Sequence, residues 1–373
     1  MSMNPEPKYR LVTRADFDGL VCAVLLKELD LIDDILFVHP KDVADGNIDI
    51  TLRDITTNVP YDSRCHIAFD HHASEAMKLC GEIPDNLVLD PDADSAARVV
   101  YRHYGGRETF PNISGEMMAE VDKADSGRFT EEEILEPSGW SLLNFIMDPR
   151  TGLGRFSGFR IGNFELMLQL IDHCRNHTVD EILALPDVKE RIDLYFSHRE
   201  QAVDQIRRCS NVFENLVVLD LRDEHTIYAC NRFMIYALHP HCDCSIHVMW
   251  GKGAQNTVFA IGHSVLNRTC PVHIGELCLE YGGGGHVGAG TVQVAHADVD
   301  RVLEELILRL TGADDGTVNI DGEHADAESI LRAVMSKSGM ALLPSMQDIV
   351  EIHERLDRIE RMIAEMSSAP TPH

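Results

Sequence analysis

Asp16 and Asp18 stand one residue apart in the stretch TRADFDGL, between an apolar run and a helical pattern. Further acidic and imidazole side chains stand at or just after later apolar runs, namely Asp54 in IDITLRD, Asp70, His71 and His72 in CHIAFDHH, and Asp125 in EVDKADSGRF. Carboxylates gathered with imidazoles at one sheet edge are stable together only when a cation offsets their charge. The sequence therefore predicts a divalent-metal site built from these side chains.

Mixed aspartate and histidine ligation suits Mn²⁺, iron or Co²⁺, with Mg²⁺ as an alternative. Zinc suits such a ligand set less well. In two-metal sites the ions lie about 3.5–4 Å apart, and one aspartate can bridge them. Such ions hold a phosphate, activate water at neutral pH and offset the charge of the transition state. We therefore expect one or two divalent ions per chain, Mn²⁺ foremost, and hydrolysis of a phosphoester or phosphoanhydride bond.

The elements that must position these residues are short apolar runs alternating with helical patterns over residues 1–160. This alternation predicts an α/β fold with an N-terminal doubly wound, mostly parallel sheet. Ligands of such sheets bind beyond the carboxyl ends of the strands, so we expect the side chains that follow each run to lie together there.

The rest of the chain divides into four further parts. Residues 161–210 carry helical spacing and are expected to form a connector, followed by a smaller C-terminal α/β domain over 211–312, an acidic linker over 313–342 and an amphipathic, coiled-coil-like helix over 343–373. The seam of that last helix consists of Ile349, Ile352, Leu356, Ile359, Ile363 and Met366. Two interpretations stay open: homo-oligomerisation through this helix, or packing of the helix on its own chain.

A glycine-rich loop, GGGGHVGAG at 282–290, is the second candidate site. Gly283, Gly284 and Gly285 allow backbone amides to approach an anion closely, and His286 adds a donor. Arg268 stands upstream as an expected phosphate partner. We therefore expect these residues to bind an anionic ligand.

Taken together, these motifs resemble those of the DHH family of phosphoesterases, exopolyphosphatase-like and oligoribonuclease-like members included. Asp70-His71-His72 is the triplet that names the family, TRADFDGL resembles its first motif, Asp54 its second and ADSGRF its fourth. GGGGHVGAG is similar to the loop of the DHH-associated C-terminal domain, and this resemblance implies that the loop binds substrate in a cleft between the two domains.

The resemblance implies a role for each residue. Asp16 would bind the first metal, Asp18 the second, and Asp54 would bridge both. His71 and Asp125 would complete the second site, with Asp122 as a rival for the place of Asp125. His72 would contact substrate or the leaving group, and Asp70 would orient its neighbours.

Arg14 departs from the family pattern, which has histidine there as a ligand of the first metal, and arginine cannot ligate. Two consequences are weighed. The guanidinium supplies a fixed positive charge and clamps phosphate, leaving a working enzyme. Alternatively, the chain has lost turnover and binds a phosphorylated ligand or a partner.

Composition limits the substrates. Thirty-three basic and 61 acidic residues give a formal net charge of −28, which repels long nucleic acid and an anionic membrane alike. The expected partner is a small anionic phosphorylated substrate: pyrophosphate, polyphosphate, a nucleoside bisphosphate, a short oligonucleotide or a cyclic dinucleotide. No apolar run reaches the length of a membrane span and the N-terminus lacks a signal-peptide core, so we expect a cytoplasmic protein.

The stretch HPHCDCSIH at 239–247 is rich in histidine and cysteine. It lacks the cysteine gap and the matching second half of common zinc motifs, and CSIHVMW alternates as a strand does. We therefore expect a strand there and no zinc.

Overall fold

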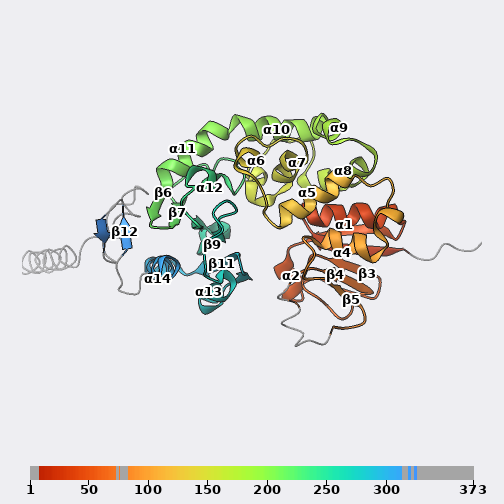
Figure 1. Ribbon diagram of the computed structural model, residues 1–373, viewed down its shortest axis with the longest axis horizontal. Coiled ribbons are helices and arrows are strands. Elements are labelled where there is room, and N and C mark those ends of the chain that lie inside the picture. The colour runs from red at the N-terminus through yellow and green to blue at the C-terminus, as the bar shows by residue number, and fades with distance from the viewer. Residues whose placement is uncertain (1–7, 73–74, 76–82, 313–317, 321–322, 326–373) are drawn as a thin grey trace, which may run out of the picture.

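The computed structural model describes residues 8–72, 75, 83–312, 318–320 and 323–325 (Figure 1). The helix expected over 343–373 lies outside the described residues, as does most of the linker expected over 313–342. Where that linker is described, it forms two short strands. None of the described helices is long and apolar enough to cross a lipid bilayer.

The N-terminal domain is built on a five-stranded sheet in which all neighbouring strands run parallel. The strand order is β2-β1-β3-β4-β5, with β1 at Tyr9–Arg14, β2 at Ile32–Val38, β3 at Asp54–Thr57, β4 at Ile67–Asp70 and β5 at Leu87–Leu89. Because the strands are parallel, their carboxyl ends meet at one edge. The predicted parallel α/β domain is confirmed.

Apolar side chains alternate between the two faces of this sheet. Leu11 and Phe69 point into the larger core, under helices α1 (Phe17–Glu28), α4 (Ala96–His103) and α5 (Gly115–Asp125). Val12 and Ala68 belong to a smaller cluster on the other side, near α2 (Pro40–Ala44). Helix α1 is buried along most of its length, which fits the unbroken apolar run GLVCAVLL.

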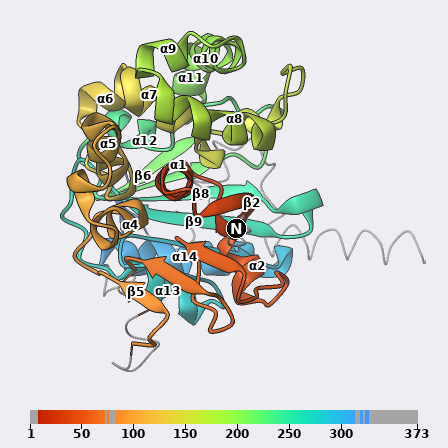
Figure 2. The ribbon, with the colours of Figure 1, turned by 90° about the vertical axis from the view of Figure 1, so that its right-hand side faces the viewer.

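A layer of helices joins the two sheets and lies above both in Figures 1 and 2. Its members are α6 (Glu131–Leu135), α7 (Gly139–Met147), α8 (Asn163–Asn176), α9 (Val179–Leu183), α10 (Pro186–Ser197) and α11 (Arg199–Cys209). Short 3₁₀ turns stand at Gly106–Glu108, Pro149–Thr151, Leu153–Arg155, Lys252–Ala254 and His296–Asp298. Most of residues 161–210 lie in α8, α9, α10 and α11.

The C-terminal domain has a mixed sheet in the order β10-β11-β9-β8-β7-β6-β12-β13. Its strands are β6 (Ser210–Phe213), β7 (Leu216–Asp220), β8 (Cys244–Trp250), β9 (Thr257–His263), β10 (Gly284–His286), β11 (Ala289–Val294), β12 (Val318–Ile320) and β13 (Glu323–Ala325). Helices α13 (Ile274–Glu280) and α14 (Val299–Thr311) share a separate apolar core with it, and α12 (Met234–Leu238) packs on the larger core.

Strands β12 and β13 correct the expectation of an irregular linker after residue 312. Ile320 pairs with Phe213 of β6, so this part of the chain extends the C-terminal sheet. The acidic composition of the segment hid the short strands, because residues on a sheet edge need no apolar face.

Candidate active site

Asp16 lies just beyond the carboxyl end of β1, where it caps α1. Its carboxylate accepts hydrogen bonds from the amide of Gly19 at 3.0 Å and from Nδ2 of Asn58 at 3.4 Å. A Cβ atom on Gly19 would stand 2.0 Å from the carbonyl oxygen of Arg14, so strand and helix meet too closely for any other residue. The sequence prediction missed Gly19, although its place directly after Asp-x-Asp was a signal.

Asp18 is held by the start of another helix. It is 3% exposed, and its two oxygens accept from the amides of Ala96 at 3.0 Å and Ala97 at 2.8 Å. These amides open α4, behind its N-cap Ser95. A helix N-terminus favours an anion, so α4 fixes the Asp18 carboxylate at the sheet edge.

His71 and Asp125 meet Asp18 at this edge. Nε2 of His71 lies 2.9 Å from Oδ2 of Asp125, and Nδ1 lies 3.1 Å from the carbonyl oxygen of Ala93. A carbonyl only accepts, so Nδ1 carries the proton and the neutral ring keeps Nε2 for a metal. Asp18, His71 and Asp125 each offer one ligand atom, and these atoms lie within 4.8 Å of one another.

Asp122, the rival of Asp125, is engaged elsewhere. Its carboxylate accepts from Nε of Arg98 at 2.9 Å and from Oγ of Ser95 at 2.8 Å. The geometry thus favours Asp125.

Asp70 contacts both histidines of the triplet. One of its oxygens lies 2.6 Å from Nδ1 of His72 and accepts from the backbone amide of His71 at 2.9 Å. These contacts suit the orienting role expected of Asp70, and they leave Nε2 of His72 free of that carboxylate.

Asp54 does not lie at this edge, so its expected role as a bridging ligand is wrong. It begins β3 instead of ending a strand, and in the parallel ladder it stands beside Arg10, near the amino end of β1. Its carboxylate accepts from Nε of Arg10 at 2.6 Å and from the amide of Thr51 at 2.6 Å. The run IDITLR is a loop ahead of the strand, and the residue just beyond the carboxyl end of β3 is Asn58.

The charges of the site call for a cation. Burial, reinforced by the charge of Asp125, raises the pKa of Asp18 to about 7. Burial also raises the pKa of Asp16. Burial alone would lower the pKa of His71, but the hydrogen bond and charge of Asp125 outweigh it and raise that pKa to about 9. Without a metal ion, bound protons offset the negative charge of these carboxylates. A divalent ion fits this set of donor atoms and would displace the protons.

Arginines from three segments surround the carboxylates, and the sequence prediction identified only Arg14. Its Nε lies 2.9 Å from Oδ2 of Asp16. Arg150 and Arg232 share Asp148, with Nε–oxygen distances of 2.8 and 3.4 Å. Although burial opposes it, these two arginines lower the pKa of Asp148 to about 2.

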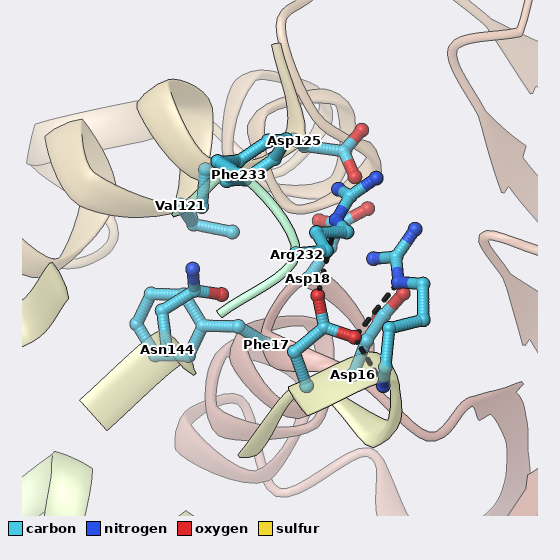
Figure 3. Close-up of a pocket in the computed structure, with 11 residues that line it drawn as sticks. Asp16, Phe17, Asp18, Val121, Asp125, Asn144, Arg232 and Phe233 are labelled. Carbon is cyan, nitrogen blue, oxygen red and sulfur yellow. Dashed lines mark hydrogen bonds and ion pairs between the residues drawn. The ribbon is translucent and has the colours of Figure 1, made fainter. Parts of the chain in front are cut away.

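Figure 3 shows Asp16, Asp18, Asp125 and Arg232 around one small pocket, which Arg150 also lines. Arg150 follows α7 and Arg232 precedes α12, so no sequence spacing links them. The pocket therefore combines metal-ligating groups with cationic groups from both halves of the chain.

The glycine-rich strand β10 reaches this site from the C-terminal domain. The rings of His286 and His72 stack with their centroids 4.6 Å apart. A Cβ on Gly283 or Gly285 would stand 2.1 or 2.2 Å from a carbonyl oxygen of β11, so packing within the sheet requires these two glycines. Within the described part of the chain, no atom lies within 4 Å of the Cβ position of Gly284, which leaves that backbone approachable.

Arg268 connects the two domains. Its guanidinium donates to the carbonyl oxygens of Gly127 at 2.7 Å and Val265 at 3.1 Å. The expected phosphate partner is therefore engaged with backbone just after Asp125. Binding of substrate by Arg268 stays a prediction.

No protein-family model and no curated protein sequence matches the chain. Among solved structures it is similar to a pGpG-specific phosphodiesterase, PggH, from Vibrio cholerae, with 56% identity and a TM-score of 0.70 over 82% of this chain and 99% of that one. It is also similar to RecJ in complex with Mn²⁺ from Thermus thermophilus, with 15% identity and a TM-score of 0.41 over 82% of this chain and 52% of that one. A third match is a putative family II inorganic pyrophosphatase from Methanococcus jannaschii, with 13% identity and a TM-score of 0.25 over 82% of this chain and all of that one.

The Asp70-His71-His72 triplet lies at the carboxyl edge of the parallel sheet, and the Vibrio phosphodiesterase shares more than half of its residues over nearly its whole length. The chain therefore belongs to the DHH family of phosphoesterases and is a metal-dependent hydrolase of phosphoester or phosphoanhydride bonds.

Proposed function

We propose that this protein is a phosphodiesterase that cleaves a short linear dinucleotide with a 5′-phosphate, such as pGpG, into mononucleotides. The observation that carries the proposal is the meeting of three metal-ligating side chains with three guanidinium groups at one sheet edge. The pGpG-specific Vibrio enzyme, at 56% identity, supports the same substrate class.

Asp18, His71 and Asp125 would hold the divalent ion, and Mn²⁺ suits this mixture of oxygen and nitrogen ligands. When bound, the ion supplies Lewis-acid activation of water and neutralisation of phosphate charge. Arg14 is the last residue of β1, at the same edge of the sheet, and its side chain pairs with Asp16. A guanidinium group cannot ligate a metal ion. We infer one tightly held ion per chain, with Arg14 supplying the positive charge that a second ion would otherwise provide.

Arg14, Arg150 and Arg232 would bind phosphate oxygens. Planar guanidinium groups pair with phosphate bidentately, and these three side chains are between 30% and 46% exposed, so they stay open to an incoming phosphate. Three such groups suit a doubly charged terminal phosphate better than the singly charged diesters of a cyclic dinucleotide. This difference favours the linear dinucleotide over the cyclic one.

His72 would handle the proton of the leaving group. Asp70 accepts from Nδ1–H of His72, which orients the ring. Nε2 of His72 would then donate a proton to the ribose oxygen that leaves. His286, stacked on the same ring, would contact the substrate from the C-terminal domain.

The glycine-rich strand would close the site over the substrate. β10 is the outermost strand at its end of the described sheet, and an edge strand leaves alternate amide groups without a sheet partner. The open surface of Gly284 brings those amides within reach of a phosphate or base. The net charge of −28 opposes long nucleic acid, so a substrate of two nucleotides fits best.

The test is mononucleotide release from pGpG by the purified protein with Mn²⁺, beside GpG, the cyclic dinucleotide and pyrophosphate. We expect turnover of pGpG, with GpG slower by at least tenfold, since a charged hydrogen bond to the terminal phosphate is worth about 1.5–3 kcal/mol. Faster turnover of GpG or of pyrophosphate would refute the proposed substrate. The matched blank is Asp18→Asn, which keeps the size of the side chain and removes its charge.

The rival function is binding of a phosphorylated ligand without turnover, and the ion pair between Arg14 and Asp16 is the observation that favours it. On that alternative, pGpG binds but no substrate of the panel is hydrolysed by the wild-type protein.

A further inference from the structure

A second group of metal-ligating side chains lies in the C-terminal domain. Asp243, Cys244 and Cys270 each offer one ligand atom, and these atoms lie within 4.8 Å of one another. Asp243 is 5% exposed and Cys244 is fully buried at the start of β8, while Cys270 lies in the segment between β9 and α13. None of the three belongs to the active site described above.

His263 lies beside this group and is the candidate for a fourth ligand, although its ring nitrogens are not among the atoms that lie within 4.8 Å of one another. It ends β9, and the ladder pairs it directly with Cys244 of β8. Its Nε2 lies 2.8 Å from the carbonyl oxygen of Val272. The carbonyl only accepts, so Nε2 carries the proton and Nδ1 keeps a lone pair. The Cys270 sulfur hydrogen-bonds with both Cys244 and His263, which places the imidazole beside Cys270.

The carboxylate of Asp243 is oriented by neighbours on both of its oxygens. Nδ2 of Asn215 donates to one at 2.7 Å, and Oγ1 of Thr269 donates to the other at 3.1 Å. With the hydrogen bond from His263 to Val272, each non-thiol ligand has a second contact. Ligands of structural metal sites are typically oriented in this way.

We propose that Asp243, Cys244, His263 and Cys270 form a structural zinc site. Two thiolates, one imidazole and one carboxylate provide four ligands, and thiolate sulfur selects zinc over Mn²⁺ or Mg²⁺. Binding releases the proton of each thiol, and the dication neutralises the buried carboxylate. All four positions are taken by protein, so the ion is closed to substrate and stabilises the fold.

The site would fasten the loop that connects the two domains. Arg268, between the ligands His263 and Cys270, donates to the carbonyl oxygen of Gly127 beside the active site. Gly288, just after the glycine-rich strand, packs against the ring of His263, with its Cβ position 3.3 Å from Nδ1. An ion held here would fix both contacts.

The test measures zinc in the full chain and cobalt absorption after exchange. We expect wild-type protein to contain about one zinc ion more per chain than Cys270→Ser, since a closed site of four ligands holds one ion. Exchange with Co²⁺ should give sulfur-to-cobalt charge-transfer absorption in the near ultraviolet. The active site, with Asp18, His71 and Asp125 as its ligands, offers no sulfur and cannot produce this band.

Two further variants protect the test against misfolding. Cys278→Ala removes a buried thiol of the same domain outside the four ligands and should keep the zinc and the cobalt band. Thr269→Val removes one hydrogen bond to Asp243 and should weaken zinc binding roughly 10-fold to 100-fold.

If Cys270→Ser does not fold, the cobalt spectrum of the wild-type protein alone tests whether the zinc site exists. Wild-type protein without the charge-transfer band overturns the proposal. So does equal zinc in wild type and Cys270→Ser, or a disulfide between Cys244 and Cys270 in place of zinc.

Discussion

The imidazole rings of His72 and His286 stack across the two domains, with centroids 4.6 Å apart and an interplanar angle of 24°. Burial, together with His72 and Arg14, lowers the pKa of His286 to about 4, so this ring is neutral near pH 7. The contact joins the family triplet of one domain to the glycine-rich strand of the other.

His286→Ala should therefore impair catalysis without loss of metal. We expect kcat/KM for pGpG to fall roughly tenfold to a hundredfold, which corresponds to a lost substrate contact of about 1.5–3 kcal/mol. Mn²⁺ affinity, measured by calorimetry, should stay within about twofold of wild type. The control is His225→Ala, an exposed histidine. Weakened Mn²⁺ binding in His286→Ala would mean that His286 acts through the metal site.

Asp18→Ala and Asp54→Ala should have different effects, because the two residues lie at opposite edges of the sheet. Asp18→Ala removes a member of the ligand cluster and should abolish tight Mn²⁺ binding. Asp54→Ala should leave Mn²⁺ affinity unchanged and lower the free energy of unfolding by roughly 1–3 kcal/mol, because Arg10 loses its partner. Calorimetry and urea denaturation measure the two effects. Loss of Mn²⁺ binding in Asp54→Ala would contradict its position beside Arg10.

Arg14→His tests how the enzyme works with arginine at this position. If the guanidinium replaces a second ion, the variant should bind about one more Mn²⁺ per chain, since histidine can ligate, with little gain in rate. Metal analysis and kcat for pGpG give the two readouts. An inactive wild type and an active Arg14→His would favour the binding-protein alternative.

Metal binding and stability should depend on pH in opposite directions. The folded pKa of Asp18, about 7, exceeds that of an unfolded aspartate, so the folded state holds an extra proton between about pH 4 and 7. His71, with a folded pKa of about 9, holds one between about pH 6.5 and 9.

Both groups make the metal-free protein less stable as pH rises through these ranges. Deprotonation of the same groups strengthens metal binding. We expect Tm with chelator to fall from about pH 5 to about pH 9 and the increase in Tm caused by Mn²⁺ to grow. Differential scanning calorimetry at several pH values measures both. An increase that shrinks with pH would exclude these groups as ligands.

Gly19→Ala should destabilise the strand-to-helix junction. The added methyl group would stand 2.0 Å from a backbone oxygen, so β1 and α1 must separate at a cost of roughly 1–3 kcal/mol. The matched control is Gly115→Ala at the start of α5, where no atom of the described residues lies within 4 Å of the Cβ position. That change should alter stability by less than about 1 kcal/mol. Urea denaturation compares the two variants.

The parallel sheet and the gathering of Asp16, Asp18, His71 and Asp125 followed from local patterns, because each residue stands directly after a strand or in a recognisable motif. The prediction that Asp54 is a metal ligand was wrong because IDITLRD alternates like a strand yet is mostly loop. The strand β3 begins only at Asp54, the last residue of that run. Pattern alone cannot resolve such a shift in a short apolar run.

Contacts between distant segments lay beyond sequence reasoning. Three such contacts depend on how the elements pack. They are the hydrogen bonds from α4 to Asp18, the ion pairs of Arg150 and Arg232 with Asp148, and the proximity of Cys244 to Cys270. Zinc was not expected at 239–247 because common motifs carry their ligands close together along the chain. Here the ladder between β8 and β9 brings them together instead.

The stack of His72 on His286 also bears on how the protein is made. The ribosome delivers the N-terminal domain first, so Asp18, His71 and Asp125 have all emerged long before the glycine-rich strand. Contacts between residues so distant along the chain form late, because closing a long loop costs entropy. On the proposed assignment, the metal ligands are therefore complete before His286 can reach the substrate, and the full site forms only when the C-terminal domain has been synthesised and docked.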